Sequence, residues 1–228
     1  MLFRSDLDYN MATFAGSDTY RIAKRDIVQN GLIFHFDAAY PNTITNTLFK
    51  NLVLNKPSLY ISGMVYTAEY GGSLYDILNG STDAVIGDTN DEYLLYSGGS
   101  ICAWISTTAN GRIIGKAIHS NPMAGAIWDI SIVADGFNGQ QPGISCCGAR
   151  SSVATFTLGN VWHYVCGTWG TGTTTIYKNG NFLTSAATSF GAQQQAGQVI
   201  RIGSAFGWNG IQRYAMIKIY NQIGRAHV

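Results

Sequence analysis

Apolar residues in most of this chain occur in short segments, which are separated by Gly, Asn, Ser or Asp rather than arranged at helical spacing. Strands bounded by such turn formers, without intervening helical patterns, are typical of two packed antiparallel sheets. The sequence therefore predicts an all-β fold, a two-sheet antiparallel jelly-roll sandwich. The strands expected after residue 70 cover residues 71–78, 84–88, 92–98, 100–107, 111–118, 126–135, 143–149, 152–158, 198–206 and 212–221.

The stretch from Val161 to Leu183 gives the most specific local prediction. Asn179 and Gly180 both adopt positive φ readily, as a two-residue type I′ turn requires, and β-forming residues flank them. The preceding run, 161–169, is apolar and aromatic on both faces, which is typical of a strand covered on two sides. We expect a hairpin next to a buried strand.

Two tryptophans lie in short apolar segments of the predicted sheets. Cys102 precedes Trp104 by two residues and Tyr164 follows Trp162 by two, so each pair shares one face of its strand. We expect these residues, together with Cys166, to pack in the core rather than to form ligand platforms.

The four cysteines fit poorly with a disulfide framework. Cys146 and Cys147 are adjacent, while Cys102 and Cys166 lie inside predicted strands. Neither a CxxC motif nor a Cys/His ligand spacing occurs. We therefore expect buried thiols rather than bridges or a metal site.

Residues 1–26 are polar and mixed in charge, and we interpret them as an N-terminal arm or linker. Arg4, Asp6 and Asp8 stand where a signal peptide needs its apolar region, so no signal peptide is expected. A strand is predicted for residues 27–36, with His35 as an ordinary strand residue.

Turn-forming and irregular polar sequence then extends from Asp37 to about Glu69, and we expect loops packed over one edge of the sandwich. The chain has 228 residues, of which 46% are hydrophobic, which suffices for one β-domain over residues 27–222. Charged residues make up 12%, and the net charge is +1. Such a neutral chain lacks the basic surface that nucleic acid binding needs, so no nucleic acid partner is expected. No apolar run reaches the roughly 18 residues of a membrane span.

Six motifs, in this order along the chain, resemble the concanavalin A-like lectin and glucanase superfamily, and specifically its laminin G-like (LamG) jelly-roll members. The motifs are GLIFHFDAAYP (31–41), GGSL with NGSTDAV (71–85), SICAWIS (100–106), GRIIGK (111–116), VWHYVCGTW with IYKNG (161–180) and IRIGSAFGWNGIQRYAMIKIYN (200–221). The resemblance implies a concanavalin A-like sandwich for residues 27–222.

Some members of that superfamily are glycoside hydrolases, which need two carboxylates on either side of the scissile bond. The chain contains only two glutamates, Glu69 and Glu92, and neither lies in a paired-carboxylate pattern. His163 and Cys166 are three apart in one strand and so lie on opposite faces, which excludes a direct Cys-His pair. We therefore expect a protein that is not an enzyme.

The resemblance also implies that calcium could be bound through loop oxygens. Asp83, Asp88 and Asp91 are weak candidates, because hard oxygen ligands suit Ca²⁺ but no defined loop spacing is present. We expect solvated turn acids here and no obligatory cofactor.

Carbohydrate binding needs an aromatic face for the sugar ring and polar groups for its hydroxyls. Two places offer both: Trp128 and Asp129 with Asn138 of the 135–141 loop, and Trp208 with Asn209 between glycines. These five residues are the predicted glycan site, with cell-surface glycan or polysaccharide as the ligand.

A Gly- and Thr-rich sandwich behind a short arm also resembles LamG-like domains of tailed-phage and other viral particle proteins. That resemblance implies a location on the virion surface or outside the cell, with the arm binding other virion proteins or sister chains. A purely architectural particle protein without a ligand is the alternative. The final residues, 223–228, show no strand or helix pattern and resemble a translated sequencing adapter, so we interpret them as a non-native tail.

Overall fold

The computed structural model describes residues 30–38, 48–61, 64–67, 73–76, 83–86, 95, 98–107, 111–117, 126–133, 143–146, 149–150, 159, 161–170, 172–187, 200–203 and 212–222. All regular structure in these ranges is β-strand, and every strand pair is antiparallel. The predicted all-β class is confirmed. The arm over residues 1–26, the tail over 223–228 and the expected strand over 152–158 lie outside the described residues.

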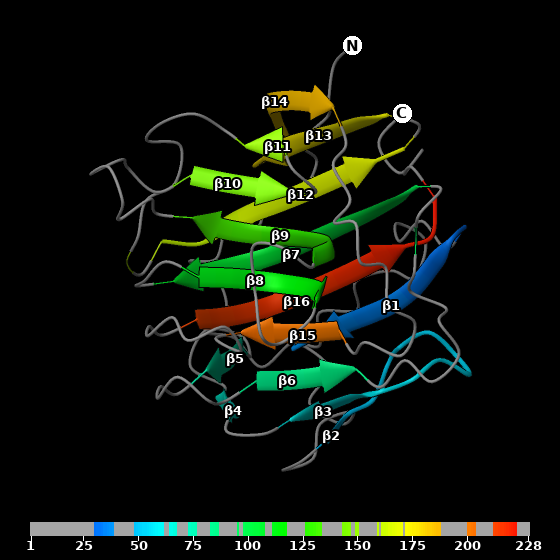
Figure 1. Ribbon diagram of the computed structural model, residues 1–228. Helices are drawn as coiled ribbons and strands as arrows, with labels where there is room; N and C mark the ends of the chain where they lie inside the picture. Colours follow the sequence, from blue (N-terminus) through cyan, green and yellow to red (C-terminus); the bar gives the residue numbers. More distant parts are fainter. Residues whose placement is uncertain are drawn as a thin grey trace.

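Within the described residues, the strands form two sheets of eight strands each (Figure 1). Sheet A has the order β14 (Asn181–Ala187), β13 (Thr173–Lys178), β12 (His163–Trp169), β7 (Gly99–Thr107), β16 (Gln212–Tyr220), β5 (Ser73–Asp76), β4 (Met64–Thr67), and β1 (Leu32–Asp37) also pairs with β16. Sheet B has the order β11 (Ala149–Arg150), β10 (Gly143–Cys146), β9 (Ala126–Val133), β8 (Gly111–Ala117), β15 (Ile200–Gly203), β6 (Asp83–Ile86), β3 (Leu59–Ile61), β2 (Leu48–Phe49).

The core lies between the two sheets. Phe36 of sheet A meets Phe49 of sheet B edge to face, with ring centroids 4.7 Å apart. Because side chains alternate along a strand, this contact shows which face of sheet A is turned inward. The almost fully buried inward residues include Phe34, Ile101, Ala103, Ile105, Val165, Ile176, Ile217 and Ile219 from sheet A and Leu59, Ile114, Ile200 and Ile202 from sheet B.

The hairpin predicted at Asn179 and Gly180 is confirmed. The two residues have φ of 50° and 80°, and Lys178 pairs with Asn181 across the turn. The Asn179 side-chain oxygen accepts a hydrogen bond of 2.9 Å from the Tyr164 backbone N–H, while its own N–H donates one of 2.7 Å to the Tyr164 carbonyl. Through these two bonds, Asn179 pairs with Tyr164, so the hydrogen bonding of β12 continues past the end of β13.

The expectation of loops between Asp37 and Glu69 is wrong in part, because β2, β3 and β4 lie there. These strands are only two to four residues long, too short to display a period of two. The loop between β2 and β3 does pack over an edge, where buried Asn51 joins it to β1. The Asn51 side-chain oxygen accepts 3.0 Å bonds from the N–H groups of His35 and Val53, and its amide donates to the carbonyls of Ile33 and Pro57.

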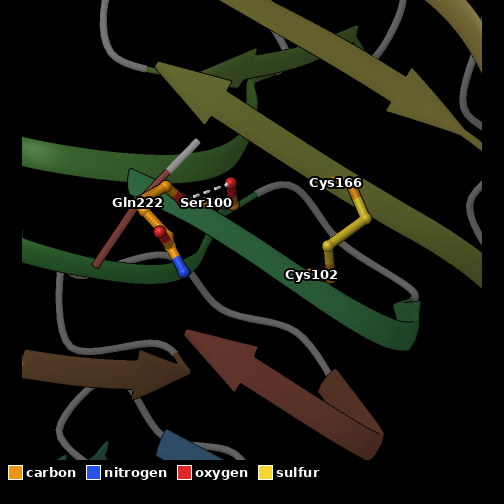
Figure 2. The surroundings of a disulfide bond; sticks show 4 residues. All are labelled: Ser100, Cys102, Cys166 and Gln222. Carbon is orange, nitrogen blue, oxygen red and sulfur yellow. Dashed lines mark hydrogen bonds between the residues drawn. A yellow bond between two sulfur atoms is a disulfide. The ribbon is translucent and has the colours of Figure 1, made fainter. Parts of the chain in front are cut away.

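Cys102 and Cys166 form a disulfide, so the expectation of buried thiols is wrong for this pair (Figure 2). The two residues are directly opposite each other on β7 and β12, with Cα atoms 4.2 Å apart. Antiparallel pairing brings side chains close at such narrow positions, which the linear separation of 64 residues conceals. Cys146 lies in β10, and Cys147 is outside the described residues.

The first and last described segments meet at one corner of sheet A. The Asn221 N–H donates a 2.9 Å bond to the Gly31 carbonyl, and the Ser100 hydroxyl donates a 3.1 Å bond to the Gln222 carbonyl (Figure 2). Gly31 has a φ of 76°, and a Cβ there would overlap the Gln222 side chain. The described chain therefore enters and leaves sheet A at the same corner. In the described part of the chain there is no helix that could cross a membrane.

Candidate functional site

The structure describes two of the five residues of the predicted glycan site. Trp128 and Asp129 lie in β9, where they pair with Lys116 and Gly115 of β8. The other three residues, Asn138, Trp208 and Asn209, lie outside the described residues. The predicted site therefore stays a prediction.

Of the three calcium candidates, one lies within the described residues. Asp83 begins β6 opposite Gly203 of β15, whereas Asp88 and Asp91 are outside the described residues. Within the described ranges there is no group of three or more His, Cys, Asp or Glu residues with the spacing of a metal site. Calcium binding stays an untested expectation.

The face of sheet A that is turned away from sheet B carries a cluster of aromatic and ionisable side chains. Since Ile101, Ala103 and Ile105 of β7 point inward, their neighbours on the strand point outward. Cross-strand pairing extends this outer face into rows across the sheet. One row contains Asp37, Met216, Trp104 and Tyr164, and the next contains His35, Lys218, Cys102, Cys166, Tyr177 and Phe182.

Four rings on this outer face form what we call the aromatic platform: Trp104, Tyr164, Tyr177 and Phe182. The Trp104 and Tyr164 ring centroids are 5.5 Å apart with planes tilted by 39°. Tyr177 and Phe182 meet edge to face at 6.3 Å. Three of the rings are half-buried, and Phe182 is 59% exposed. One ring comes from each of β7, β12, β13 and β14.

The expectation that Trp104, Tyr164 and Cys166 belong to the inner core is therefore wrong about their side of the sheet. Cys166 is buried, but it lies on the outer face with the two half-buried rings. Both faces of the central strands are apolar, so alternation alone does not tell which face is turned inward. Trp162 is half-buried just before β12 begins.

Tyr164 and Tyr220, which both lie on the outer face, are less acidic than a free tyrosine. Burial, and to a smaller extent Tyr220, raises the pKa of Tyr164 well above its usual range. Burial raises the pKa of Tyr220 to about 12. Both hydroxyls are therefore neutral hydrogen-bonding groups at physiological pH.

Ionisable groups gather at the other end of the rows, on β1 and β16. The His35 Nε2 atom lies 3.9 Å from an Asp37 carboxylate oxygen, and Lys218 is directly opposite His35. Burial and the Lys218 charge lower the pKa of His35 to about 4, so its imidazole is neutral at pH 7. Burial lowers the pKa of Lys218, while Asp37 acts in the opposite direction.

The sequence did hold a signal for the outer face. Cys102 precedes Trp104 by two residues, whereas Cys166 follows Tyr164 by two. In an antiparallel pair this mirrored order places cysteine opposite cysteine and ring opposite ring, as the register shows. By contrast, His163 pairs with inward Ile105 and Cys166 is oxidised, in agreement with the exclusion of a Cys-His pair.

Residues 79–222 match the family described as the Concanavalin A-like lectin/glucanases superfamily. The chain belongs to this superfamily, as its two-sheet sandwich and the order of its motifs indicate. No curated protein matches the chain.

Solved structures with a similar fold include a sialidase and two toxin binding domains. Trypanosoma rangeli sialidase with the inhibitor DANA has a TM-score of 0.63 at 12% identity, over 88% of this chain and 32% of the sialidase. The binding domain of Botulinum neurotoxin DC in complex with rat synaptotagmin II has a TM-score of 0.60 at 14% identity, over 86% and 49% of the two chains. The binding domain of Paraclostridial Mosquitocidal Protein 1 has a TM-score of 0.55 at 15% identity, over 86% and 50%. This chain thus spans half or less of each, and the likeness concerns the fold alone.

Proposed function

We propose that this domain is a non-catalytic carbohydrate-binding or adhesion module that binds a surface glycan. The observation that carries the proposal is the aromatic platform, where Trp104 and Tyr164 lie side by side on an outer face and Phe182 is mostly exposed. Sugar rings pack against such aromatic faces because their C–H surfaces are apolar while their hydroxyls stay available for hydrogen bonds. Thr168 and Thr175, in the next row of the same face, are half-buried hydroxyl neighbours of the rings.

The same face supports binding rather than hydrolysis. Glycosidases commonly place two carboxyl groups about 5 to 10 Å apart around the bond that they cleave. Asp37 is the one carboxylate whose side chain is described on this face, and it lies beside His35 and Lys218. The platform itself contributes no acid to such a pair.

The disulfide supports a role outside a reducing compartment, because disulfides persist mainly in extracellular, periplasmic and particle-surface proteins. A virion surface or extracellular location, as the LamG-like resemblance implies, agrees with this. The joined ends at Gly31 and Asn221 would let the domain be attached from one corner. The binding domain of Botulinum neurotoxin DC, solved in complex with rat synaptotagmin II, has a similar fold.

A glycan array on the purified chain tests the proposal, with and without calcium. Trp104→Ala is expected to abolish the signal of the wild-type protein, and Trp208→Ala tests the alternative loop site. Tyr60→Ala is the matched control, because Tyr60 is a 61% exposed aromatic residue of sheet B. Loss of binding in Trp208→Ala but not in Trp104→Ala would move the site to the loops. An array without any signal for the folded protein would favour the purely architectural role.

A further inference from the structure

Exposed apolar side chains gather in the β2–β3 hairpin, residues 48–61, at the edge of sheet B (Figure 1). Among the described residues, four large hydrophobic side chains are exposed, and two of them belong to this hairpin. Leu54 in its loop is 83% exposed, and Tyr60 of β3 is 61% exposed. Leu59 is fully buried in the core, so Tyr60 next to it lies on the outer face of sheet B.

The loop of this hairpin holds Leu54 at its tip. The side chain of Asn51 fastens one end of the loop to β1, and the Asn51 N–H donates a 3.4 Å bond to the Ser58 hydroxyl at the other end. Asn55, which follows Leu54, has a φ of 60°, in the left-handed region that asparagine adopts more readily than most residues. The chain therefore turns directly after Leu54. A leucine presented on an anchored loop loses little entropy when it meets a partner.

The hairpin is also basic. Lys50 and Lys56 lie on either side of the tip, and Lys50 is exposed. No Asp or Glu occurs in residues 38–68. On the adjacent strand β6, the residue opposite Tyr60 is apolar Val85. Residues 48–61 thus combine an exposed leucine and an exposed tyrosine with two lysines and no acidic residue.

This combination fits an anionic phospholipid surface. Leucine gains free energy on entering the acyl region, tyrosine rings favour the headgroup level, and lysines are attracted to anionic headgroups. A bilayer accepts one projecting side chain without a matching pocket. A protein partner needs about 800 Å² of surface on each side for a stable interface, which a single loop tip does not offer. The polar backbone of the loop must keep its contact with water, so insertion is limited to the side chain at the tip.

We propose that the β2–β3 hairpin docks this domain on an anionic phospholipid surface, with the Leu54 side chain inserted below the headgroups and Lys50 and Lys56 against the headgroup phosphates. The hairpin belongs to sheet B, whereas the aromatic platform lies on the outer face of sheet A. The membrane contact therefore goes beyond the proposed glycan binding and does not depend on it.

Flotation of the full chain with lipid vesicles tests the contact. Vesicles of phosphatidylcholine alone are compared with vesicles that also contain phosphatidylglycerol, at roughly 50 and 500 mM salt. Binding is expected on the anionic vesicles, with an affinity about tenfold lower at the higher salt concentration, because two lysines contribute. Equal binding to both kinds of vesicle, or no binding by the folded protein, would overturn the proposal. Release of the protein by inorganic phosphate at constant ionic strength would indicate a site for the free anion and would also overturn it.

Two substitutions separate the apolar from the charged part of the contact. Leu54→Ser is expected to weaken vesicle binding by about tenfold, because the inserted side chain is lost, and Lys50→Gln by about fivefold at low salt. Val161→Ser is the matched control, since Val161 is a 46% exposed apolar residue before β12 of sheet A, and it should bind as the wild type does. Circular dichroism verifies that each variant is folded. Equal affinities of Leu54→Ser and Val161→Ser would overturn the insertion of Leu54.

Quenching by brominated phospholipids measures the depth of the tip directly. Leu54→Trp should show more quenching on anionic vesicles than the wild-type protein, because the introduced indole enters the brominated region. Val161→Trp adds an indole at the other exposed position and should show no additional quenching. If the two variants were quenched to the same extent, the orientation of the hairpin towards the membrane would be refuted.

Discussion

The indole of Trp104 and the phenol ring of Tyr164 lie 5.5 Å apart on the two central strands β7 and β12. Two residues from each ring, Cys102 and Cys166 join the same two strands through a disulfide. The covalent bond and the surrounding ladder thus hold both rings in one arrangement. A binding surface whose side chains are already positioned loses less entropy when a ligand is bound.

Removing the disulfide is expected to lower the free energy of unfolding substantially. Because the bond closes a loop of 64 residues in the unfolded chain, the chain-entropy model gives a loss of about 4 kcal/mol for Cys102→Ala/Cys166→Ala. Urea unfolding with and without a dithiol reductant measures it. Reductant should destabilise the wild-type protein and leave the double variant unchanged. If peptide mapping found both cysteines alkylated without reduction, the pairing would be refuted.

Stability is expected to fall on acidification between pH 6.5 and about 4 because of His35. Its pKa is lowered to about 4 in the folded protein, so over this range the unfolded chain binds a proton that the folded state does not. The contribution is fully present above pH 6.5 and is lost as the pH falls, and it amounts to about 3 kcal/mol. Urea unfolding of wild type and His35→Gln against pH measures the difference. Parallel curves for the two proteins would contradict this assignment.

Asn51→Ala is expected to destabilise the fold by about 3 kcal/mol. The substitution removes four side-chain hydrogen bonds and leaves buried backbone groups of β1 and the β2–β3 loop without those partners. Leu54→Ala in the same loop is the control, because Leu54 is 83% exposed and its truncation should have little effect. Equal melting temperatures for the two variants would show that Asn51 does not anchor the loop.

Much of the fold could be predicted from local sequence. The Asn179-Gly180 turn was predictable because few residue types tolerate its backbone angles, and turn formers separate most of the strands. The Cys102–Cys166 pair and the outward direction of Trp104 depended on register between strands that are distant in sequence. Because β7 and β12 carry apolar residues on both faces, the sequence alone did not show which face of the sheet Trp104 lies on. The same ambiguity led the sequence analysis to assign Trp104 and Tyr164 to the inner core, whereas the predicted glycan residues stay a prediction.

In the proposed function, the ligand contacts the outer face of sheet A at Trp104. The chain has five tryptophans, so a two-dimensional NMR spectrum can follow the indole N–H signal of each during titration with a glycan that gives a signal on the array. Trp169 is the internal reference, because it is 1% exposed and its indole N–H donates a 2.9 Å bond to the Leu95 carbonyl. We predict that the Trp104 signal, identified by its loss in Trp104→Phe, shifts saturably while the Trp169 signal stays in place. A saturable shift of Trp128 or Trp208 with Trp104 unchanged would contradict the claim.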